Sequence, residues 1–97
     1  LLRMEHMSDC VGWIVRAKAG RDKDGSFCVI GRSGEYLLLA DGKRRKMAAP
    51  KRKKLRHAEI LVRDPQEFDH PVLEKLRQTQ SATDRELRRA LAAFKGR

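Results

Sequence analysis

Short apolar runs, separated by glycine-containing turns, follow one another through the first two thirds of the chain. Four such runs are present, at 10–19, 26–32, 34–41 and 55–62, and a short basic strand at 43–47 can follow the turn at 40–42. In the first run apolar residues recur at every second position, which is typical of a strand with one buried face. Residues 31–34 have the composition of a tight hairpin connection. Five short strands with turns this regular predict a small antiparallel barrel, and therefore a mainly β fold.

The sequence changes character after Asp64 and Pro65, a pair that ends the strand pattern. We expect a helix that has Pro71 in its first turn and runs to about Gln78, because proline is favoured at the start of a helix. Either Asp69 or His70 can cap it. Val72, Leu73 and Leu76 would form its apolar face.

A second helix is predicted near the end of the chain. Thr83 and Glu86 form a capping box, in which each side chain can accept a hydrogen bond from the other residue's backbone amide. The helix is expected to run to about Lys95, and Gly96 is placed to end it. Its apolar residues recur at i, i+3, i+4 and i+7, and they are Leu87, Ala90, Leu91 and Phe94.

These patterns divide the chain into three parts. Residues 1–9 lack any periodicity, and we expect a disordered leader there. Residues 10–63 would form the barrel, which contains the basic segment 43–56, and residues 64–97 would form a C-terminal helical tail. The sequence leaves open whether this tail packs on the barrel or docks on another protein.

The charge of the chain is large and unevenly distributed. The net charge is +10; residues 1–57 carry 15 Lys and Arg against 6 Asp and Glu, whereas 58–97 carry 8 against 7. Such an excess points to a polyanionic partner. Aromatic residues make up only 5% of the chain, which argues against a base-stacking platform. The basic block has no interleaved apolar face, which argues against a membrane surface.

The polar residues offer no pattern for catalysis. Cys10 and Cys28 do not match the spacing of a zinc site, and we expect both to be small buried residues. Asp22, Asp24 and Asp41 lie in predicted turns, where aspartate serves local hydrogen bonding. We therefore expect no enzyme, no metal site, no cofactor and no small-molecule substrate.

The candidate binding residues are basic and fall in two places. One group lies in the loop between the first two strands, and the other is the run of nine basic residues from Lys43 to Arg56, which contains no acid. A block of like charge repels itself unless it is solvated or neutralised. Residues 51–54 are expected to form an extended arm that binds nucleic acid. Two alternatives to phosphate binding remain: a solvated edge strand at 43–46, and a disordered basic loop at 51–54. The candidates are Lys18, Arg21, Lys23, Lys43, Arg44, Arg45, Lys46, Lys51, Arg52, Lys53, Lys54 and Arg56.

Other residues have plainer interpretations. We expect Trp13 in the core, and His57 as a half-buried strand residue, although a phosphate contact is the alternative for His57. Gly12 and Gly20 are expected to serve the backbone, through a bulge and a positive φ. The arginines of the last helix (Arg85, Arg88 and Arg89) are expected on a solvated face.

The stretch from Gly12 to His57 resembles a known family. "VGWIVRAKAGRDKDGSFCVIG" is similar to a KOW motif, with Gly12, Gly20 and Gly25 around its turn. With "LADGKRRK" and "PKRKKLRH" in order, it resembles the small bacterial KOW-domain RNA-binding proteins related to the large-subunit ribosomal proteins fourteen-e, six-e and twenty-seven-e. The resemblance extends to the tail, since members often end in a helix like "TDRELRRALAAF". Members commonly have Gly where this chain has Asp24.

The resemblance implies an SH3-like barrel whose KOW loop and basic segment face RNA, in particular ribosomal RNA. The expected function is that of a non-catalytic, ribosome-associated RNA-binding protein, cytoplasmic and monomeric when free. Asp24 is expected to widen the turn and to weaken phosphate contact at its tip. Two alternatives stay open: a protein–protein interaction module of the transcription or translation machinery, and non-specific binding of duplex DNA.

Overall fold

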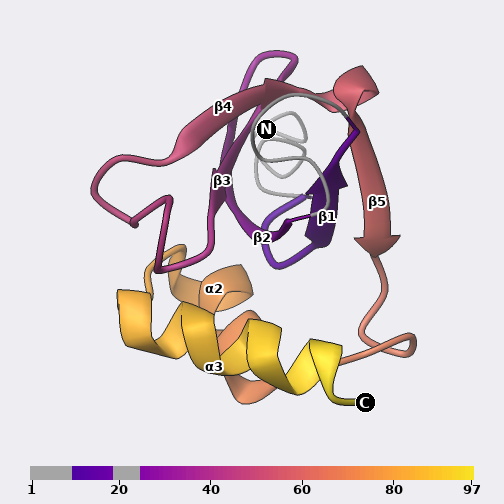
Figure 1. Ribbon diagram of the computed structural model, residues 1–97, viewed down its shortest axis with the longest axis vertical. Coiled ribbons are helices and arrows are strands. Elements are labelled where there is room, and N and C mark those ends of the chain that lie inside the picture. Colours follow the sequence, from indigo (N-terminus) through magenta and orange to yellow (C-terminus); the bar gives the residue numbers. More distant parts are fainter. Residues whose placement is uncertain (1–9, 19–24) are drawn as a thin grey trace.

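A computed structural model describes residues 10–18 and 25–97 of the protein. In this part of the chain it contains five strands, two α-helices and one turn of 3-10 helix (Figure 1). The strands are β1 (Ile14–Ala17), β2 (Ser26–Ser33), β3 (Tyr36–Ala40), β4 (Lys51–Lys54) and β5 (Ala58–Val62). The 3-10 turn is η1 (Leu55–His57), and the α-helices are α2 (Pro71–Thr79) and α3 (Asp84–Lys95).

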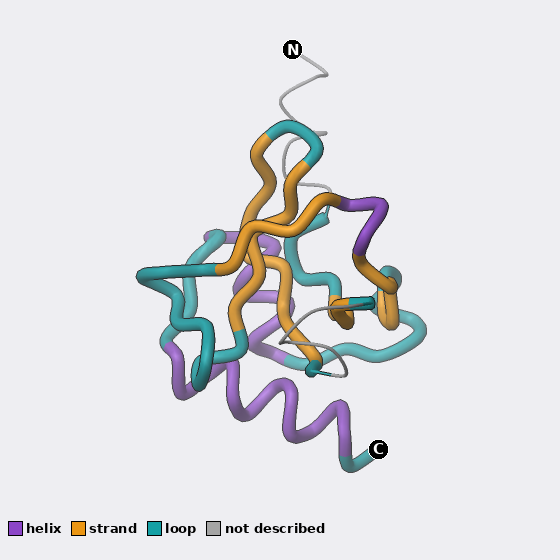
Figure 2. Tube along the Cα trace, turned by 45° about the horizontal axis from the view of Figure 1, so that its top comes forward, coloured by secondary structure: helices purple, strands orange, loops and turns teal. Residues whose placement is uncertain are grey.

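The strands form one antiparallel sheet in the order β4-β3-β2-β1-β5. Its two outermost strands, β4 and β5, are consecutive in sequence and are joined only by η1, so the sheet must curl to bring its edges together (Figure 2). The register shifts between Ile14 and Val15 on β1, and between Val29 and Gly31 on β2. Bulges of this kind increase local twist, which suits a barrel-like sheet. The predicted mainly β, five-stranded antiparallel architecture is confirmed.

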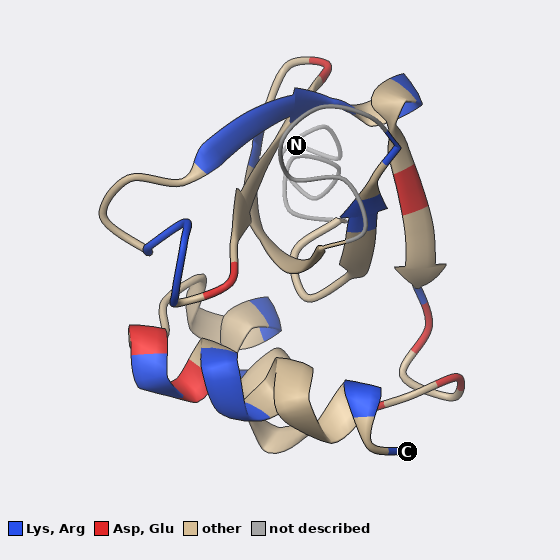
Figure 3. Ribbon diagram, in the orientation of Figure 1, with Lys and Arg blue, Asp and Glu red and all other residues tan. Residues whose placement is uncertain are grey.

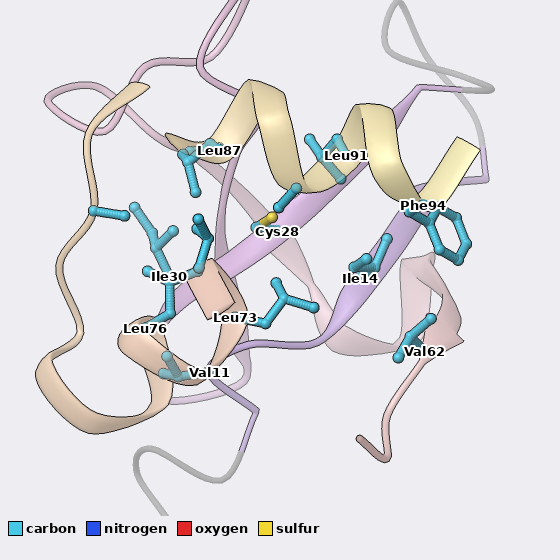
Figure 4. Close-up of a cluster of buried hydrophobic side chains, with 14 residues drawn as sticks. Val11, Ile14, Cys28, Ile30, Val62, Leu73, Leu76, Leu87, Leu91 and Phe94 are labelled. Carbon is cyan, nitrogen blue, oxygen red and sulfur yellow. The ribbon is translucent and has the colours of Figure 1, made fainter. Parts of the chain in front are cut away.

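Apolar side chains are buried on both faces of this sheet. On one face Ile14, Cys28 and Val62 pack against α2 and α3 (Figure 4). On the other face a second cluster, which includes Val15 and Phe27, is buried by the curl of the sheet itself. Ile14 and Val15, which are adjacent on β1, are therefore both fully buried. The alternation of apolar residues in the sequence predicted burial of Val15 but not of Ile14.

Both helices match the sequence-based prediction. The ring nitrogen Nδ1 of His70 accepts a 3.1 Å hydrogen bond from the backbone of Val72, so His70 rather than Asp69 caps α2. The capping box of α3 is complete, with Thr83 Oγ1 and Glu86 Oε1 each accepting the other residue's backbone amide at 3.1 and 2.9 Å. Gly96 follows the last residue of α3 as expected.

The helices belong to the same core as the sheet. Leu73, Leu76 and Leu87 have no exposed surface, and they lie in one cluster with residues of β1 and β2 (Figure 4). The sequence left open whether the C-terminal tail packs on the barrel. The C-terminal helices do pack on one face of the sheet, and burial of their apolar sides stabilises both layers.

The fourth strand was predicted in the wrong place. Residues 43–47 form a turn rather than a strand, because backbone groups there bond within the turn: the amides of Asp41 and Gly42 both donate to the carbonyl oxygen of Arg45. The strand is instead β4, at residues that were expected to form an extended arm on nucleic acid rather than part of the sheet. It pairs with β3 over its whole length, from Leu39↔Lys51 to Tyr36↔Lys54.

Two further boundaries differ from the prediction. Residues 55–57 form η1 rather than strand, so His57 is exposed and is not a half-buried strand residue. The hairpin between β2 and β3 turns at Gly34 and Glu35, and Gly34 has a φ of +61°. Gly31 and Arg32, expected in the connection, extend β2 instead, because the bulge in β2 lengthens the strand.

Cys10 and Cys28 are both buried and free, as expected. Burial, with a smaller contribution from the charge of Asp41, raises the pKa of the Cys28 thiol to about 12. Trp13 is half-buried: it packs against the second cluster, which contains Val15 and Phe27. The guanidinium of Arg63 lies 5.1 Å from the centroid of the Trp13 ring. The leader expected at 1–9 lies outside the described residues.

Candidate nucleic-acid interface

Strand β4 carries four consecutive cationic side chains along an edge of the sheet (Figure 3). Alternation along a strand sends Arg52 and Lys54 to the face that also carries Tyr36 of β3. Lys53 lies opposite Leu37 and faces the other way. Pairing with β3 fixes the backbone of β4, so these charges sit on a rigid element rather than on a free arm.

Tyr36 organises the outer face of this edge. The guanidinium carbon of Arg52 lies 4.3 Å from the centroid of its ring, and Lys54 Nζ lies 5.9 Å from the same centroid. Cation–π contacts of this kind are worth about 0.5–1 kcal/mol at exposed sites. They orient both side chains and leave their N–H groups able to donate to phosphate oxygens.

Two more predicted residues lie at the end of β4. Arg56 is exposed on η1, the turn that follows β4 directly. The backbone amide of Lys18 donates to the carbonyl oxygen of His57 at 3.4 Å, which places exposed Lys18 beside the same turn. We call the residues 51–54, Arg56 and Lys18 together the basic edge.

Residues 42–46 form a separate basic turn, which contains the predicted cations 43–46. Asp41 Oδ1 accepts hydrogen bonds from the backbone amides of Lys43 and Arg45, at 2.9 and 2.8 Å. Asp41 therefore has the local role expected of a turn aspartate. Lys43, Arg44 and Lys46 are exposed, whereas Arg45 is half-buried.

The basic turn is fixed to the N-terminal part of α3. The Nη1 of Arg88 donates to the carbonyl oxygen of Gly42 at 2.5 Å, and Asp84 Oδ1 accepts the backbone amide of Met47 at 2.8 Å. Gly42 has a φ of +78°, and a Cβ atom there would lie 2.1 Å from the carbonyl oxygen of Asp84. Only glycine allows this close approach of the turn to the helix.

Some cations elsewhere have acidic partners. Arg16 pairs with Glu59 at 2.7 Å, and Lys75 pairs with Glu86 at 2.9 Å. Arg77 pairs with both Asp69 and Glu74. In the described part of the chain, by contrast, no ion pair is formed by the basic-edge residues Arg52, Lys53, Lys54 and Arg56, or by Lys43, Arg44 and Lys46 of the basic turn. Unpaired charge on two ordered segments is what a polyanion-binding surface requires.

Not every predicted site residue joins these surfaces. Arg21, Lys23 and Gly20 lie outside the described residues. Gly12 has the positive φ that was expected, +94°, but it lies against α2, where a Cβ atom would come 2.8 Å from Cγ of Arg77. Gly25 directly precedes β2 and lies beside the basic turn.

Two residues of α3 take part although the sequence did not predict it. Arg88 was expected on a solvated face, yet it bonds to the basic turn. Lys95 lies two helical turns further along α3 and lines the same cavity as Arg88. The i, i+7 spacing of Arg88 and Lys95 predicts that they share one face of the helix, but it does not predict which segment of the protein contacts that face.

Two absences concern the described residues, 10–18 and 25–97. Within these ranges no group of three or more His, Cys, Asp or Glu is placed to hold a metal ion. No helix there has both the length and the apolar character needed to cross a membrane.

Neither a family model nor a curated protein sequence matches this chain.

Proposed function

We propose that this protein is a non-catalytic RNA-binding protein, associated with the ribosome, that contacts RNA phosphates through the basic edge and the basic turn. The observation that carries the proposal is the basic edge itself: consecutive cations on an ordered strand, with Arg52 and Lys54 oriented by Tyr36. Each phosphate that such a surface neutralises releases counterions, which supplies affinity without base recognition.

Structured RNA is the partner that best fits this surface. Double-helical RNA hides its base edges in a deep, narrow groove and is recognised mainly through phosphates, 2′-hydroxyls and shape. Trp13 is half-buried, and Arg52 already covers the ring of Tyr36, so neither ring is offered as a platform for a series of bases. A rigid basic edge with few free aromatic rings favours recognition of the RNA backbone.

The sheet topology supports the SH3-like, KOW-type interpretation of the barrel. Five antiparallel strands curl so that β4 and β5 are joined by a single turn, and the segment that resembles the KOW family contains β1 to β4. The family resemblance is the argument for ribosomal RNA as the target and for the cytoplasm as the site of action.

Edge protection alone does not account for the basic edge. Lysines on an edge strand prevent pairing with other chains, and this contributes to the choice of residues in β4. The cations nevertheless continue beyond the strand to Arg56 on η1 and to Lys18, where no strand edge needs protection. A binding surface explains the strand and its extension together.

The test is a binding titration of a labelled ribosomal RNA hairpin, followed by fluorescence anisotropy. The variant R52Q/K54Q removes two charges from the basic edge, and the control R85Q/R89Q removes two exposed charges from α3. We expect the first variant to weaken binding by about tenfold and the control to stay within about twofold of wild type. Equal effects of the two variants would show that only net charge matters.

Two additions to this titration separate the alternatives. A DNA duplex of the same sequence, used as competitor, should displace the RNA poorly; equal competition would favour non-specific duplex binding. Cosedimentation with ribosomal subunits should be lost as salt is raised. Cosedimentation that persists at high salt in R52Q/K54Q would instead identify a protein–protein contact.

A further inference from the structure

An open cavity of about 460 Å³ lies between the basic turn and α3. This volume falls within the range of small-molecule sites in proteins. Lys43 and Arg44 line it from the basic turn, and Arg88 and Lys95 line it from α3. Segments more than 40 residues apart in the sequence therefore contribute cations to one site.

These cations are available to an anion. In the described part of the chain, none of Lys43, Arg44 and Lys95 forms an ion pair. Arg88 Nη1 is used by the carbonyl oxygen of Gly42, which fixes the guanidinium at the wall of the cavity and leaves its other N–H groups. A phosphate group would find several charge-assisted donors here.

The cavity is not a simple anion site, because its lining is also apolar and contains one acid. Leu91 and Ala92 of α3 present methyl groups, and Phe27 of β2 also lines the cavity. Asp41 also lines the cavity. Its Oδ1 accepts both hydrogen bonds from the backbone amides of Lys43 and Arg45. Among the described residues, its second carboxylate oxygen accepts no hydrogen bond and can accept one from a ligand.

A ligand that satisfies this lining must combine an anion, a flat apolar body and an N–H donor. A nucleotide with an exocyclic amine has all three: its phosphate suits the cations, its base suits the apolar surface, and its amine can donate to a carboxylate as cytosine N4 does. Inorganic phosphate would meet Asp41 as a like charge.

We propose that this cavity binds one unpaired, amine-bearing nucleotide of the RNA. The base lies on Leu91 and Ala92, and its amine donates to Asp41. The phosphate lies among the four cations. This inference rests on the proposed function and adds to it: the basic edge provides general affinity for the RNA backbone, and the cavity selects RNA that offers an unpaired nucleotide.

Two substitutions on α3 separate the cavity from the rest of the surface. A92E places a carboxylate inside the cavity, whereas A93E places the same charge at the next position of the same helix, outside the cavity lining. Both alanines are exposed and glutamate is a good helix former, so both variants are expected to fold. Circular dichroism and urea denaturation would verify this.

The experiment compares two RNA hairpins, one fully paired and one with a single bulged cytidine. Wild type and A93E should bind the bulged hairpin about tenfold more tightly, because one base finds an apolar contact and an acceptor. A92E should bind both hairpins equally. A hairpin with a bulged uridine, which lacks the exocyclic amine, should bind wild type several-fold less tightly than the cytidine hairpin.

Three results would overturn the inference. They are equal binding of the bulged and paired hairpins by wild type, a preference for the bulge that survives in A92E, and equal binding of the cytidine and uridine bulges. Titration with cytidine monophosphate provides a further arm: an A92E-sensitive affinity for it without any preference for the bulge would assign the cavity to a free nucleotide. Each of these results leaves the proposed function intact, because that depends on the paired hairpin and on R52Q/K54Q.

Discussion

Arg88 of α3 donates a 2.5 Å hydrogen bond from Nη1 to the carbonyl oxygen of Gly42, a residue 46 positions earlier in the chain. This bond joins the helical layer to the basic turn that follows β3. The turn and the helix thus hold each other in place, so the position of several cations depends on the packing of α3. The C-terminal helices are part of the candidate interface as well as part of the core.

Replacement of Gly42 by alanine should destabilise the protein strongly. A Cβ atom would lie 2.1 Å from the carbonyl oxygen of Asp84, and the φ of +78° is unfavourable for a residue with a side chain. We expect a loss of about 3 kcal/mol in the free energy of unfolding, from steric overlap and backbone strain together. Urea denaturation followed by the fluorescence of Trp13, the one tryptophan in the chain, measures it.

Gly34 provides the matched control for this prediction. Its φ is also positive, +61°, but nothing lies within 4 Å of a Cβ atom added there. Gly34→Ala should therefore cost only the backbone penalty, about 1 kcal/mol. Equal losses in the two variants would show that Gly42 is required for its backbone conformation and not for its contact with α3.

Loss of the capping hydroxyl at Thr83 should weaken α3. Thr83 Oγ1 accepts the amide of Glu86, one of the backbone donors that a helix start leaves without an intrahelical partner. Thr83→Ala should lower the free energy of unfolding by about 1 kcal/mol. Ser81→Ala, at an exposed position two residues before the cap, should change it by less than about 0.5 kcal/mol. A larger effect at Ser81 than at Thr83 would contradict this role for the cap.

Acid should destabilise the fold through three carboxylates. The backbone amide of Thr83, together with a hydrogen bond from Lys75, holds the pKa of Glu86 below its ordinary value of 4.5. Two backbone amides do the same to the pKa of Glu67, and a hydrogen bond from Arg77 lowers the pKa of Asp69 below its ordinary value of 3.8. At a pH just below these ordinary values the unfolded chain binds more protons than the folded one, so stability falls as the pH falls.

The variant E86Q tests this pH dependence. Glutamine can still accept the amide of Thr83 but does not titrate. The stabilisation from Glu86 is complete above pH 4.5 and is lost as the pH falls through the lowered folded-state pKa. Urea midpoints measured from pH 7 to pH 3 should therefore fall less steeply for E86Q than for wild type. Parallel curves would show that Glu86 contributes nothing to the acid transition.

The thiol of Cys28 should resist alkylation in the folded protein. Its side chain is fully buried, and burial raises its pKa to about 12, so little thiolate forms at neutral pH and none is accessible. Mass spectrometry after treatment with iodoacetamide should find Cys28 unmodified in buffer and modified in guanidinium chloride. Modification of Cys28 in buffer, in a sample whose circular dichroism is native, would contradict the buried position.

Local patterns in the sequence were enough to predict the helices and most of the strands. His70, Pro71 and the pair Thr83 and Glu86 specify their helix starts through contacts a few residues apart, and such contacts can be read from sequence. The strand prediction failed at 43–47, because the side chain of Asp41, two residues earlier, accepts the backbone amides that a strand would need for pairing. Pairing of 51–54 with β3 depends on contacts between distant segments, which periodicity does not encode.

The sequence predicted which types of residue form the candidate site but not how they are arranged in space. The run of cations from Lys43 to Arg56 was evident, but its division into an edge strand and a turn was not. The participation of Arg88 depends on how α3 packs against that turn, which is a tertiary relationship. Tyr36, which orients Arg52 and Lys54, could have been found only from the register of β3 and β4.

The most direct test of the central claim is the salt dependence of RNA binding by wild type, R52Q/K54Q and R85Q/R89Q. A plot of log affinity against log salt has a slope of about 0.7–0.9 for each phosphate neutralised. If Arg52 and Lys54 each contact a phosphate, the slope for R52Q/K54Q should be shallower than that of wild type by about 1.4–1.8. The slope for R85Q/R89Q should equal that of wild type. Wild-type slopes in both variants, or the same reduction in both, would show that the basic edge does not lie on the RNA.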